Sequence, residues 1–405
     1  MHRVRMALPY YKELGWEPVI LASDEKYVEG LIDPLLNETI PPDIEIHKVK
    51  AWPVKITRRI WLGSLSLRSY YFFKKKGNEL LGTKKFDLVF FSTSMFHLCA
   101  LGRYWKKKFN VPFIVDMQDP WRNDFYLNKP RSQRPPKFAI AHAINKRMEA
   151  YTMPFVDGIM AVSQGYIDDL KSRYPSLKNK FSAVIPFGTS LKDFEIVKQK
   201  NILPEIINCT PEKINIVYVG TLTQFFLPLI KAFFIAFSRI VPDKEKYHFY
   251  FIGTKYKKLD TTNKPVKLLA EKLNLGHLIT EVPERIPYFS ALSIIMNSDI
   301  LFIPGSSDPN YNASKVYHNI QTGNPIFSIY NEKSLVKKAI EDTNSGIVIS
   351  IRGDDNESDI VEKISVKLKN FERLHHQKTD IKKMKIYSAK AMVQKQVNFF
   401  NKVIE

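Results

Sequence analysis

The sequence predicts an α/β protein made of two doubly wound parallel sheets, and three observations support this. Short apolar runs of strand length alternate with amphipathic, helix-like segments along the chain. The runs are apolar throughout, which is typical of parallel strands covered by helices on both faces. They form two series separated by a polar stretch at residues 193–213, and 405 residues are enough for two or three domains.

The first series of expected strands is VILAS, DLVFFST, PFIVDMQ, GIMAVS and FSAVIPF, at residues 19–23, 87–93, 112–118, 158–163 and 181–187. Helix-like segments lie between them at residues 97–109, 137–152 and 164–173. The start of the chain differs, because residues 2–14 predict a helix ending at Gly15 with no strand or glycine loop before it. We therefore expect the first strand of this domain to be missing and the natural start to lie upstream.

The second series is NIVYVG, HFYFIG, ILFIPG, PIFSIY and GIVIS, at residues 215–220, 248–253, 300–305, 325–330 and 346–350. A last helix is expected over residues 381–404, with apolar positions near helical spacing at Ile386, Ala389, Val393, Val397 and Phe400. The predicted domains are residues 1–195 and 196–375, followed by a C-terminal helical segment, 376–405.

Composition and motifs exclude several classes. Hydrophobic residues make up 44% and charged residues 25%, an ordinary globular mixture that is neither collagenous nor disordered. Two cysteines, Cys99 and Cys209, cannot form a disulfide framework or a thiolate zinc site. The sequence has no G-x-G-x-x-G after a strand, no P-loop and no H-E-x-x-H, so we expect neither a metal nor a dinucleotide cofactor. No apolar run reaches the length of a membrane span.

The charge points to an anionic partner. The chain carries 61 basic and 41 acidic residues, and residues 51–150 alone hold 20 basic and 6 acidic side chains. Residues 55–76 contain seven basic residues, no acidic residue and several aromatic ones, which suits an anionic membrane surface. Single-stranded nucleic acid or an ordinary solvated helix pair are the alternatives; no nucleic-acid motif accompanies the segment. The expected membrane residues are Arg58, Arg59, Trp61, Lys74, Lys75 and Lys76.

Three strands of the second series end at glycines: Gly220, followed by Thr221; Gly253, followed two residues later by Lys255; and Gly305. In open α/β sheets a ligand lies beyond the carboxyl ends of the strands, and a glycine there lets the backbone approach a phosphate. Ordinary turns are the alternative for each glycine. Together the three predict a nucleotide site.

A polar loop at residues 308–313 leads into a short helix that we expect Ser314 to cap and Gly323 to end. Lys315 lies in its first turn, where a cation opposes the helix dipole. A bound diphosphate would offset that cost, whereas an exposed lysine of no special role is the simpler alternative.

These residues carry a resemblance to a family. SKVYHNIQTGNPI at residues 314–326 resembles the S-K-x-x-E-Y-x-x-x-G-x-P-[IV] signature in the C-terminal domain of GT-B glycosyltransferases, especially the family-4-like group. VDMQDPW at residues 115–121 resembles the D-x-x-D-P-W loop of bacterial surface-polysaccharide members. Weaker similarities run along nearly the whole chain, at residues 161–163, 185–188, 219–222 and 287–304.

The resemblance implies two Rossmann-like domains facing a cleft, with the last helix crossing back to the N-terminal domain. It implies a metal-independent enzyme that moves a sugar, with retention, from a nucleoside-diphosphate sugar to an acceptor hydroxyl. The acceptor would be lipid-linked or a saccharide in surface-polysaccharide assembly at the cytoplasmic face of the plasma membrane. The implied donor residues are Gly220, Thr221, Gly253, Lys255, Ser314, Lys315 and His318.

On the acceptor side we expect Asp116, Asp119 and Trp121. The candidates for the catalytic base are Asp119, His97 and His142. An Asx turn at Asp119 and a structural role for His97 are the alternatives. The family's ribose-binding glutamate is replaced by His318, and the other acidic residue of the usual pair by Asn310. A non-catalytic relative that binds a nucleotide sugar or a partner, and an epimerase of the same fold, therefore remain open.

Overall fold

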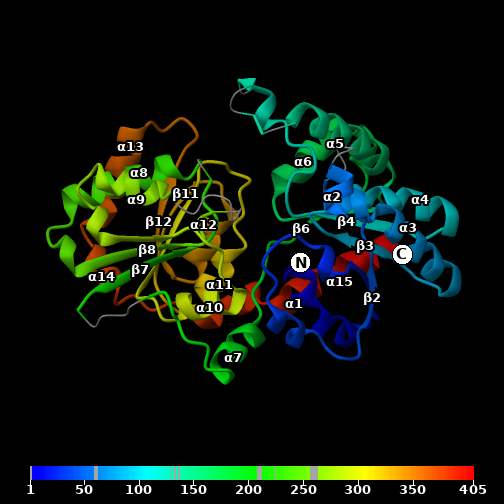
Figure 1. The fold of residues 1–405 in the computed structure, drawn as a ribbon, viewed down its shortest axis with the longest axis horizontal. Helices are drawn as coiled ribbons and strands as arrows, with labels where there is room; N and C mark the ends of the chain where they lie inside the picture. Colours follow the sequence, from blue (N-terminus) through cyan, green and yellow to red (C-terminus); the bar gives the residue numbers. More distant parts are fainter. Residues whose placement is uncertain are drawn as a thin grey trace. The chain divides into compact units, whose positions relative to one another are not determined.

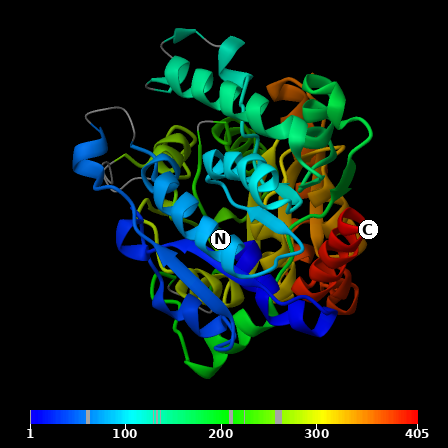
Figure 2. The ribbon, with the colours of Figure 1, turned by 90° about the vertical axis from the view of Figure 1, so that its right-hand side faces the viewer.

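The computed structural model describes residues 2–58, 63–128, 130–131, 134–135, 137–207, 212–223, 225–255 and 263–405. The chain forms two compact units (Figures 1 and 2), neither of which is one continuous stretch. Unit 1 comprises residues 1–30, 40–186 and 392–405, and unit 2 comprises residues 31–39 and 187–391. No helix of the described chain is long and apolar enough to cross a membrane.

Unit 1 contains two parallel sheets. A four-stranded sheet has the order β3–β4–β5–β6, formed by Val89–Ser92, Phe113–Met117, Gly158–Ala161 and Phe181–Val184. A two-stranded sheet pairs β1 (Val19–Ser23) with β2 (Glu45–Val49). The five strands expected in this half are confirmed. β2 was not predicted, because its sequence EIHKV mixes polar and apolar residues rather than forming an apolar run; Ile46 and Lys48 are exposed and Val49 is buried.

The helices of unit 1 follow the predicted pattern. The chain enters through α1 (His2–Tyr11) and a short 3-10 turn that ends at Gly15 in the left-handed conformation, as predicted. Three helices after it pack around the larger sheet: α3 (Leu65–Thr83), α4 (Ala100–Phe109) and α6 (Gln164–Arg173). The remaining helices are α2 (Val54–Thr57) and α5 (Phe138–Thr152).

Unit 2 contains a six-stranded parallel sheet in the order β12–β11–β10–β7–β8–β9. The strands are Ile214–Val219, Tyr247–Ile252, Ile279–Val282, Ile300–Ser306, Ile326–Asn331 and Gly346–Ile351, numbered β7 to β12. The order runs outwards in both directions from the neighbouring pair β7 and β10, which confirms a doubly wound sheet. β9 was not predicted, because it is short and carries Thr280 and Glu281.

Helices cover both faces of this sheet. One core joins α8 (Leu227–Ile240), α9 (Pro265–Glu271), α13 (Glu357–Leu368) and α14 (Phe371–Leu374), around buried phenylalanines such as Phe233 and Phe237. The other core joins α7 (Leu191–Gln199), α10 (Tyr288–Met296), α11 (Lys315–Thr322) and α12 (Leu335–Asp342). Burial on both faces explains why the strand sequences are apolar throughout.

The predicted C-terminal helix is two elements. A 3-10 segment, Ile381–Tyr387, ends at Ser388, whose extended backbone interrupts the helix before α15 (Ala389–Ile404). Ile386 is 53% exposed, so its predicted role in the apolar stripe was wrong. The other four predicted positions are buried. The part of α15 from Met392 belongs to unit 1, where Tyr11 donates a hydrogen bond of 2.6 Å to Gln396.

Candidate functional site

The sheet of unit 2 has a recess at the point where its strand order reverses. Its lining comes from the ends of β7 and β10 and from the loop and helix that follow β10, and the enclosed volume is about 20 Å³. Ligands of doubly wound sheets bind at this switch point, beyond the carboxyl ends of the strands. The lining residues include Tyr218, Val219, Phe226, Gly305, Tyr311 and Lys315.

Two glycines shape the recess. Gly220 follows β7 with φ +148°, and a Cβ there would collide with the Lys315 ammonium. Gly305, in β10, has φ +63°, and a Cβ there would collide with the Ile329 carbonyl oxygen. Gly305 therefore requires glycine for space as well as for backbone conformation. At Gly220 the flexible end of Lys315 could move aside, so the backbone conformation is what favours glycine there. Gly220 lets Lys315 lie across the end of β7, while Gly305 serves the packing of the sheet.

Lys315 is the charged group of the recess. Its side chain is exposed, and its Nζ lies 5.3 Å from the centre of the Tyr218 ring. The surrounding protein desolvates the ammonium and Arg285 repels it, which lowers the pKa of Lys315 to about 8. A cation that forms no ion pair within the described chain, in the first turn of α11, suits an anionic ligand.

The two other predicted residues of α11 differ from expectation. Ser314 has a helical backbone and makes no side-chain cap, so the predicted capping role was wrong. His318 is only 8% exposed; its ring stacks on Phe194 and meets Tyr288 edge-on, with centroids 6.5 and 5.9 Å apart. Tyr288 in turn donates a 2.7 Å hydrogen bond to the buried carboxylate of Asp193. His318 thus lies in a packed aromatic cluster and is not among the residues that line the recess.

The loop after β8 holds the predicted residues Gly253 and Lys255. Thr254, between them, donates a hydrogen bond of 3.0 Å to Glu281 Oε1. Glu281 Oε2 accepts from the backbone N–H groups of Val266 and Lys267, at 2.9 and 3.0 Å, in the first turn of α9. Burial raises the pKa of Glu281, although these hydrogen bonds oppose the shift. One buried carboxylate therefore fixes this strand-end loop to a neighbouring helix.

In unit 1, Asp116 is fully buried at the end of β4. Its Oδ2 lies 3.0 Å from Arg3 Nε and accepts hydrogen bonds from Ser92 and Gln118 at 2.7 and 3.1 Å. Arg3 also donates to the carbonyl oxygen of Ile185, at 2.9 Å. The arrangement joins helix α1 to the strand ends of the sheet. Asp116 therefore lies in an internal ion pair, where a proton-accepting role toward a substrate is blocked.

Asp119 and Trp121 lie in the loop after β4. Asp119 is exposed, yet the surrounding protein desolvates its carboxylate and raises its pKa above the ordinary value. Trp121 is 3% exposed and stacks on Phe96, with ring centroids 5.8 Å apart. Its buried indole Nε1 has no hydrogen-bond partner within the described residues. An exposed carboxylate of raised pKa can accept a proton, whereas Trp121 supports the loop beneath it.

The histidines of unit 1 are engaged by protein groups. His97 Nδ1 lies 2.7 Å from Ser66 Oγ, and its ring also hydrogen-bonds to the side chain of Asn145. Burial lowers the pKa of His97 despite the bond to Asn145, so the imidazole is neutral at pH 7. His142 Nε2 lies 2.7 Å from Asp124 Oδ1. These contacts match the structural alternative for His97.

The predicted membrane residues that the structure describes lie on or near helices α2 and α3. Arg59 and Trp61 lie outside the described residues. Arg58 pairs with Glu29 at 3.0 Å, Lys76 with Glu79 at 2.5 Å, and Lys74 lies over the Tyr104 ring. Lys75 is exposed on α3. Within the described chain, no cluster of three or more His, Cys, Asp or Glu side chains could hold a metal ion.

Comparisons with known proteins bear on the family and the fold of the chain. Residues 4–192 match the model of Glycosyltransferase Family 4. Sucrose-phosphate synthase from Thermosynechococcus elongatus is similar in structure, with a TM-score of 0.63 at 13% identity over 98% of this chain and 92% of that one. The structure of HepE from Anabaena in complex with UDP and glucose has a TM-score of 0.61 at 12% identity, over 98% of this chain and 94% of that one. A comparison with curated proteins found no match.

A third similar structure is the UDP-forming α,α-trehalose-phosphate synthase from Burkholderia xenovorans in complex with glucose-6-phosphate. Its TM-score is 0.54 at 10% identity, over 85% of this chain and 78% of that chain. These proteins are GT-B glycosyltransferases, and at such low identity the likeness concerns the fold. The chain therefore has the GT-B fold, and its residues 4–192 are similar to the Glycosyltransferase Family 4 model.

Proposed function

We propose that the protein transfers a sugar from a nucleoside-diphosphate sugar to an acceptor hydroxyl in the assembly of a surface polysaccharide or glycolipid. The observation that carries the proposal is the place of Lys315. It is a cation without an ion pair in the described chain, in the first turn of α11 beside Gly220, at the switch point of a doubly wound sheet. The UDP and UDP-glucose named for the HepE structures support a nucleotide sugar as donor.

Lys315 and the N-terminus of α11 would act on the leaving diphosphate. Negative charge grows on the diphosphate as the bond to the sugar breaks, and a fixed ammonium beside a positive helix end stabilises that charge. Because the pKa of Lys315 is about 8, the side chain is mainly charged at pH 7. Gly253, Lys255 and Thr221 would complete the donor side. We propose that these groups suffice without a metal ion.

Asp119 is the proposed base for the acceptor hydroxyl. Its carboxylate is exposed and its pKa is raised, whereas Asp116 is tied to Arg3 and His97 to Ser66 and Asn145. A raised pKa makes a carboxylate a better proton acceptor. Retention of configuration and a hexose as the transferred sugar are part of the proposal on the strength of the family resemblance alone.

The acceptor is proposed to be lipid-linked or a saccharide, at the cytoplasmic face of the plasma membrane. The excess of 20 basic over 6 acidic residues in 51–150 supports an anionic partner for the N-terminal half of the chain. We expect no role for nucleic acid.

A non-catalytic relative is the second candidate, and His318 favours it. The family signature has a glutamate at that position, whereas here a buried imidazole lies among Phe194 and Tyr288. Such a protein would bind the nucleotide sugar without transferring the sugar. An epimerase of the same fold would instead change the sugar while it is still bound to the nucleotide.

Thermal unfolding in the presence of UDP, GDP, ADP, CMP and their sugars tests the donor site. A ligand at about 100 times its Kd stabilises the folded protein by about 2.7 kcal/mol. We expect one diphosphate series to raise the Tm of the wild type and not of Lys315→Ala. Lys367→Ala, an exposed lysine on α13, is the matched control and should respond like the wild type. Equal Tm shifts in Lys315→Ala and Lys367→Ala would show that Lys315 is not part of the donor site.

Transfer itself is tested with a radiolabelled nucleotide sugar and a membrane extract that supplies acceptors. Label should enter the lipid or saccharide fraction, with or without EDTA, and Asp119→Asn should reduce transfer by about 100-fold or more, the usual scale of general-base catalysis. Donor binding without transfer by the wild type would favour the non-catalytic candidate. Conversion of the bound sugar without transfer would favour the epimerase.

A further inference from the structure

The loop that carries Asp119 is fixed on both sides of that residue. It begins at the end of β4, where Asp116 is fully buried. Because Pro120 follows Asp119, the backbone of Asp119 is restricted to extended conformations. Trp121, the next residue, is buried against the ring of Phe96. The exposed carboxylate of Asp119 therefore lies on a short loop between two buried side chains.

Glu149, on helix α5, binds the main chain of this loop directly after Trp121. Its Oε2 accepts a hydrogen bond of 3.1 Å from the backbone N–H of Arg122. Its Oε1 accepts hydrogen bonds from the Arg173 guanidinium at 2.6 Å and from the Tyr174 hydroxyl at 3.0 Å. Glu149 is fully buried, where a carboxyl group needs such partners. One side chain thus ties the loop both to α5 and to the end of α6.

His142 holds the same loop from a position earlier on α5. Its Nε2 lies 2.7 Å from Asp124 Oδ1, and the same oxygen accepts a hydrogen bond of 2.8 Å from Arg122 Nε. Seven residues, about two turns of α-helix, separate His142 from Glu149, so the two side chains lie on one face of α5. Helix α5 therefore contacts the loop at residue 122 and at residue 124.

The same face of α5 also contacts other groups near the strand ends of unit 1. Asn145, which lies between His142 and Glu149 on this face, forms a side-chain hydrogen bond with His97. Met148 packs against the hydrophobic core that includes Trp121. The polar and apolar contacts of this face are therefore made with the loops that follow β3 and β4.

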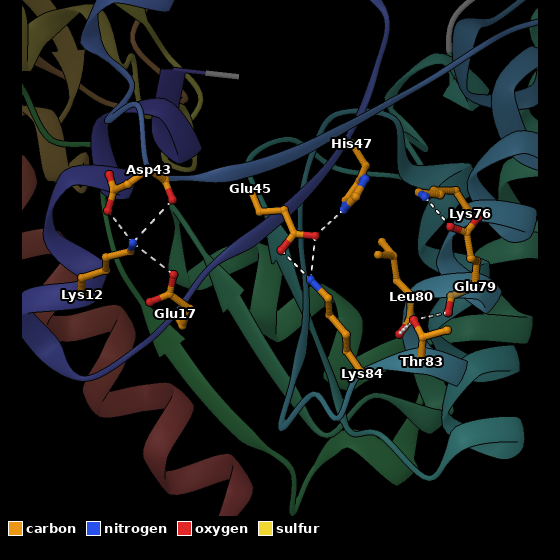
Figure 3. A network of polar contacts seen from close by, with 10 residues as sticks. All are labelled: Lys12, Glu17, Asp43, Glu45, His47, Lys76, Glu79, Leu80, Thr83 and Lys84. Carbon is orange, nitrogen blue, oxygen red and sulfur yellow. Dashed lines mark hydrogen bonds and ion pairs between the residues drawn. The ribbon is translucent and has the colours of Figure 1, made fainter.

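The contacts of Glu149 differ from the ion pairs near β2, which Figure 3 shows. The side chains of those pairs are between 28% and 70% exposed, and water screens the attraction between them. Loss of the fully buried Glu149 carboxylate would instead leave buried hydrogen-bond donors without a partner. The pairs in Figure 3 are Lys12 with Glu17 and Asp43, Lys84 with Glu45, and Lys76 with Glu79.

We propose that Glu149 and His142 are positioning residues, which hold the loop so that the Asp119 carboxylate can accept a proton from the acceptor hydroxyl. They act through the main chain of Arg122 and the side chain of Asp124. Such support matters because a displacement of about 1 Å at a reacting group can slow a reaction about 100-fold. The inference rests on the proposed function, in which Asp119 is the base.

A purely structural role for Glu149, which would only join α5 to α6, is the alternative. The hydrogen bonds from Arg173 and Tyr174 serve that role, and both go to Oε1. The hydrogen bond from the loop goes to Oε2. Because the two roles use different oxygen atoms, variants of the partners can separate them.

Hydrogen–deuterium exchange of the Arg122 amide in the full-length protein, followed by mass spectrometry, tests whether Glu149 holds the loop. Glu149→Gln leaves one acceptor oxygen for three donors, and the Arg173 guanidinium competes for it most strongly. The Arg122 amide should therefore exchange about 10-fold faster or more, the effect of losing one hydrogen bond to a charged group. Tyr174→Phe removes a hydrogen bond to Oε1 only and should leave this exchange unchanged.

Carbon-13 NMR of carboxyl-labelled aspartate reports on Asp119 itself, whose signal is identified by its absence in Asp119→Asn. Desolvation raises the pKa of Asp119 in the folded protein. A loosened loop admits water, so in Glu149→Gln and in His142→Leu this pKa should fall towards its ordinary value. The wild-type pKa should persist in Tyr174→Phe. His142 is only partly buried, so His142→Leu keeps the test available if Glu149→Gln does not fold.

Unchanged amide exchange and an unchanged Asp119 pKa in Glu149→Gln would overturn the proposal. Equal changes in Tyr174→Phe would also overturn it, because the contacts of Glu149 would then be structural only. Where the wild type transfers the radiolabelled sugar, Glu149→Gln should slow transfer about 10-fold or more and leave the Tm shift caused by the nucleotide unchanged. Exchange and NMR need no substrate, so absence of transfer by the wild type would reject the proposed function separately.

Discussion

At the residue scale, Lys315 determines how the donor site should respond to pH. Its pKa of about 8 means that the ammonium is charged below pH 8 and loses its proton as the pH rises above it. Diphosphate affinity should therefore fall between pH 7 and 9.5. Calorimetric titration with UDP should show that the affinity falls by about 10-fold or more over this pH range. This is the effect expected from the loss of one hydrogen bond to a charged group. Lys315→Met should bind weakly at both pH values; the same pH dependence in that variant would assign the effect to another group.

Glu281 carries a second prediction at this scale. Its Oε2 faces two backbone N–H donors in α9, and its Oε1 accepts from Thr254. The amide of Glu281→Gln has only one acceptor oxygen, so at least one donor is left unsatisfied. We expect a loss of about 1–3 kcal/mol in the free energy of unfolding, measured with urea. Thr254→Val removes only one of the three hydrogen bonds to Glu281, so it should lower the free energy of unfolding by less. An unchanged free energy of unfolding in Glu281→Gln would show that water replaces the lost hydrogen bond.

Site residues differ in how far the sequence could reveal them. The glycines and Lys315 were predicted because strand-end position and motif spacing are local properties. The pairing of Asp116 with Arg3 was not, since the partners are far apart in sequence and only the fold brings them together. Tyr218, Tyr311 and Glu281 were missed for the same reason. Alternating burial along β9 is the one local signal that could have suggested Glu281.

At the element scale, α15 should contribute strongly to the stability of unit 1. Phe400 contacts the rings of Tyr11, Trp16 and Phe90, with centroids 6.2, 5.3 and 4.8 Å away. Phe400→Ala should therefore cost about 3–5 kcal/mol in urea unfolding. Ile404→Ala, at an exposed position of the same helix, should change stability by less than about 0.5 kcal/mol. Similar effects of the two variants would mean that the helix end does not pack as described.

The elements themselves were largely predictable. Ten strands follow from apolar runs, which are typical of strands in parallel sheets covered by helices. β2 and β9 were not predicted because they are short and carry charged side chains among their apolar residues. The break at Ser388 was missed because helical spacing continues across it, whereas the extended backbone of Ser388 follows from its tertiary contacts.

At the scale of the whole molecule, the excess of 61 basic over 41 acidic residues should make association with anionic surfaces sensitive to salt. The Debye length falls from about 10 Å at 0.1 M to about 3 Å at 1 M. Vesicle binding should therefore be largely lost at 0.5 M NaCl. UDP affinity should change less, because Lys315 acts at contact distance within a recess. Measuring vesicle binding and UDP affinity over the same range of salt concentrations checks this difference. An equal loss of vesicle binding and of UDP affinity would contradict the prediction.

The discontinuous make-up of unit 2 constrains how this chain could acquire a new donor preference. Residues 31–39 belong to unit 2, where Asp33 Oδ2 accepts a 3.1 Å hydrogen bond from the backbone N–H of Phe289 in α10. A recombination event with one crossover near Pro186 would separate that carboxylate from its partner. Exchange of a complete donor-binding half between homologous enzymes thus requires crossovers around residues 30, 39, 186 and 391. Gradual substitution within the recess is the simpler evolutionary route to a different nucleotide sugar.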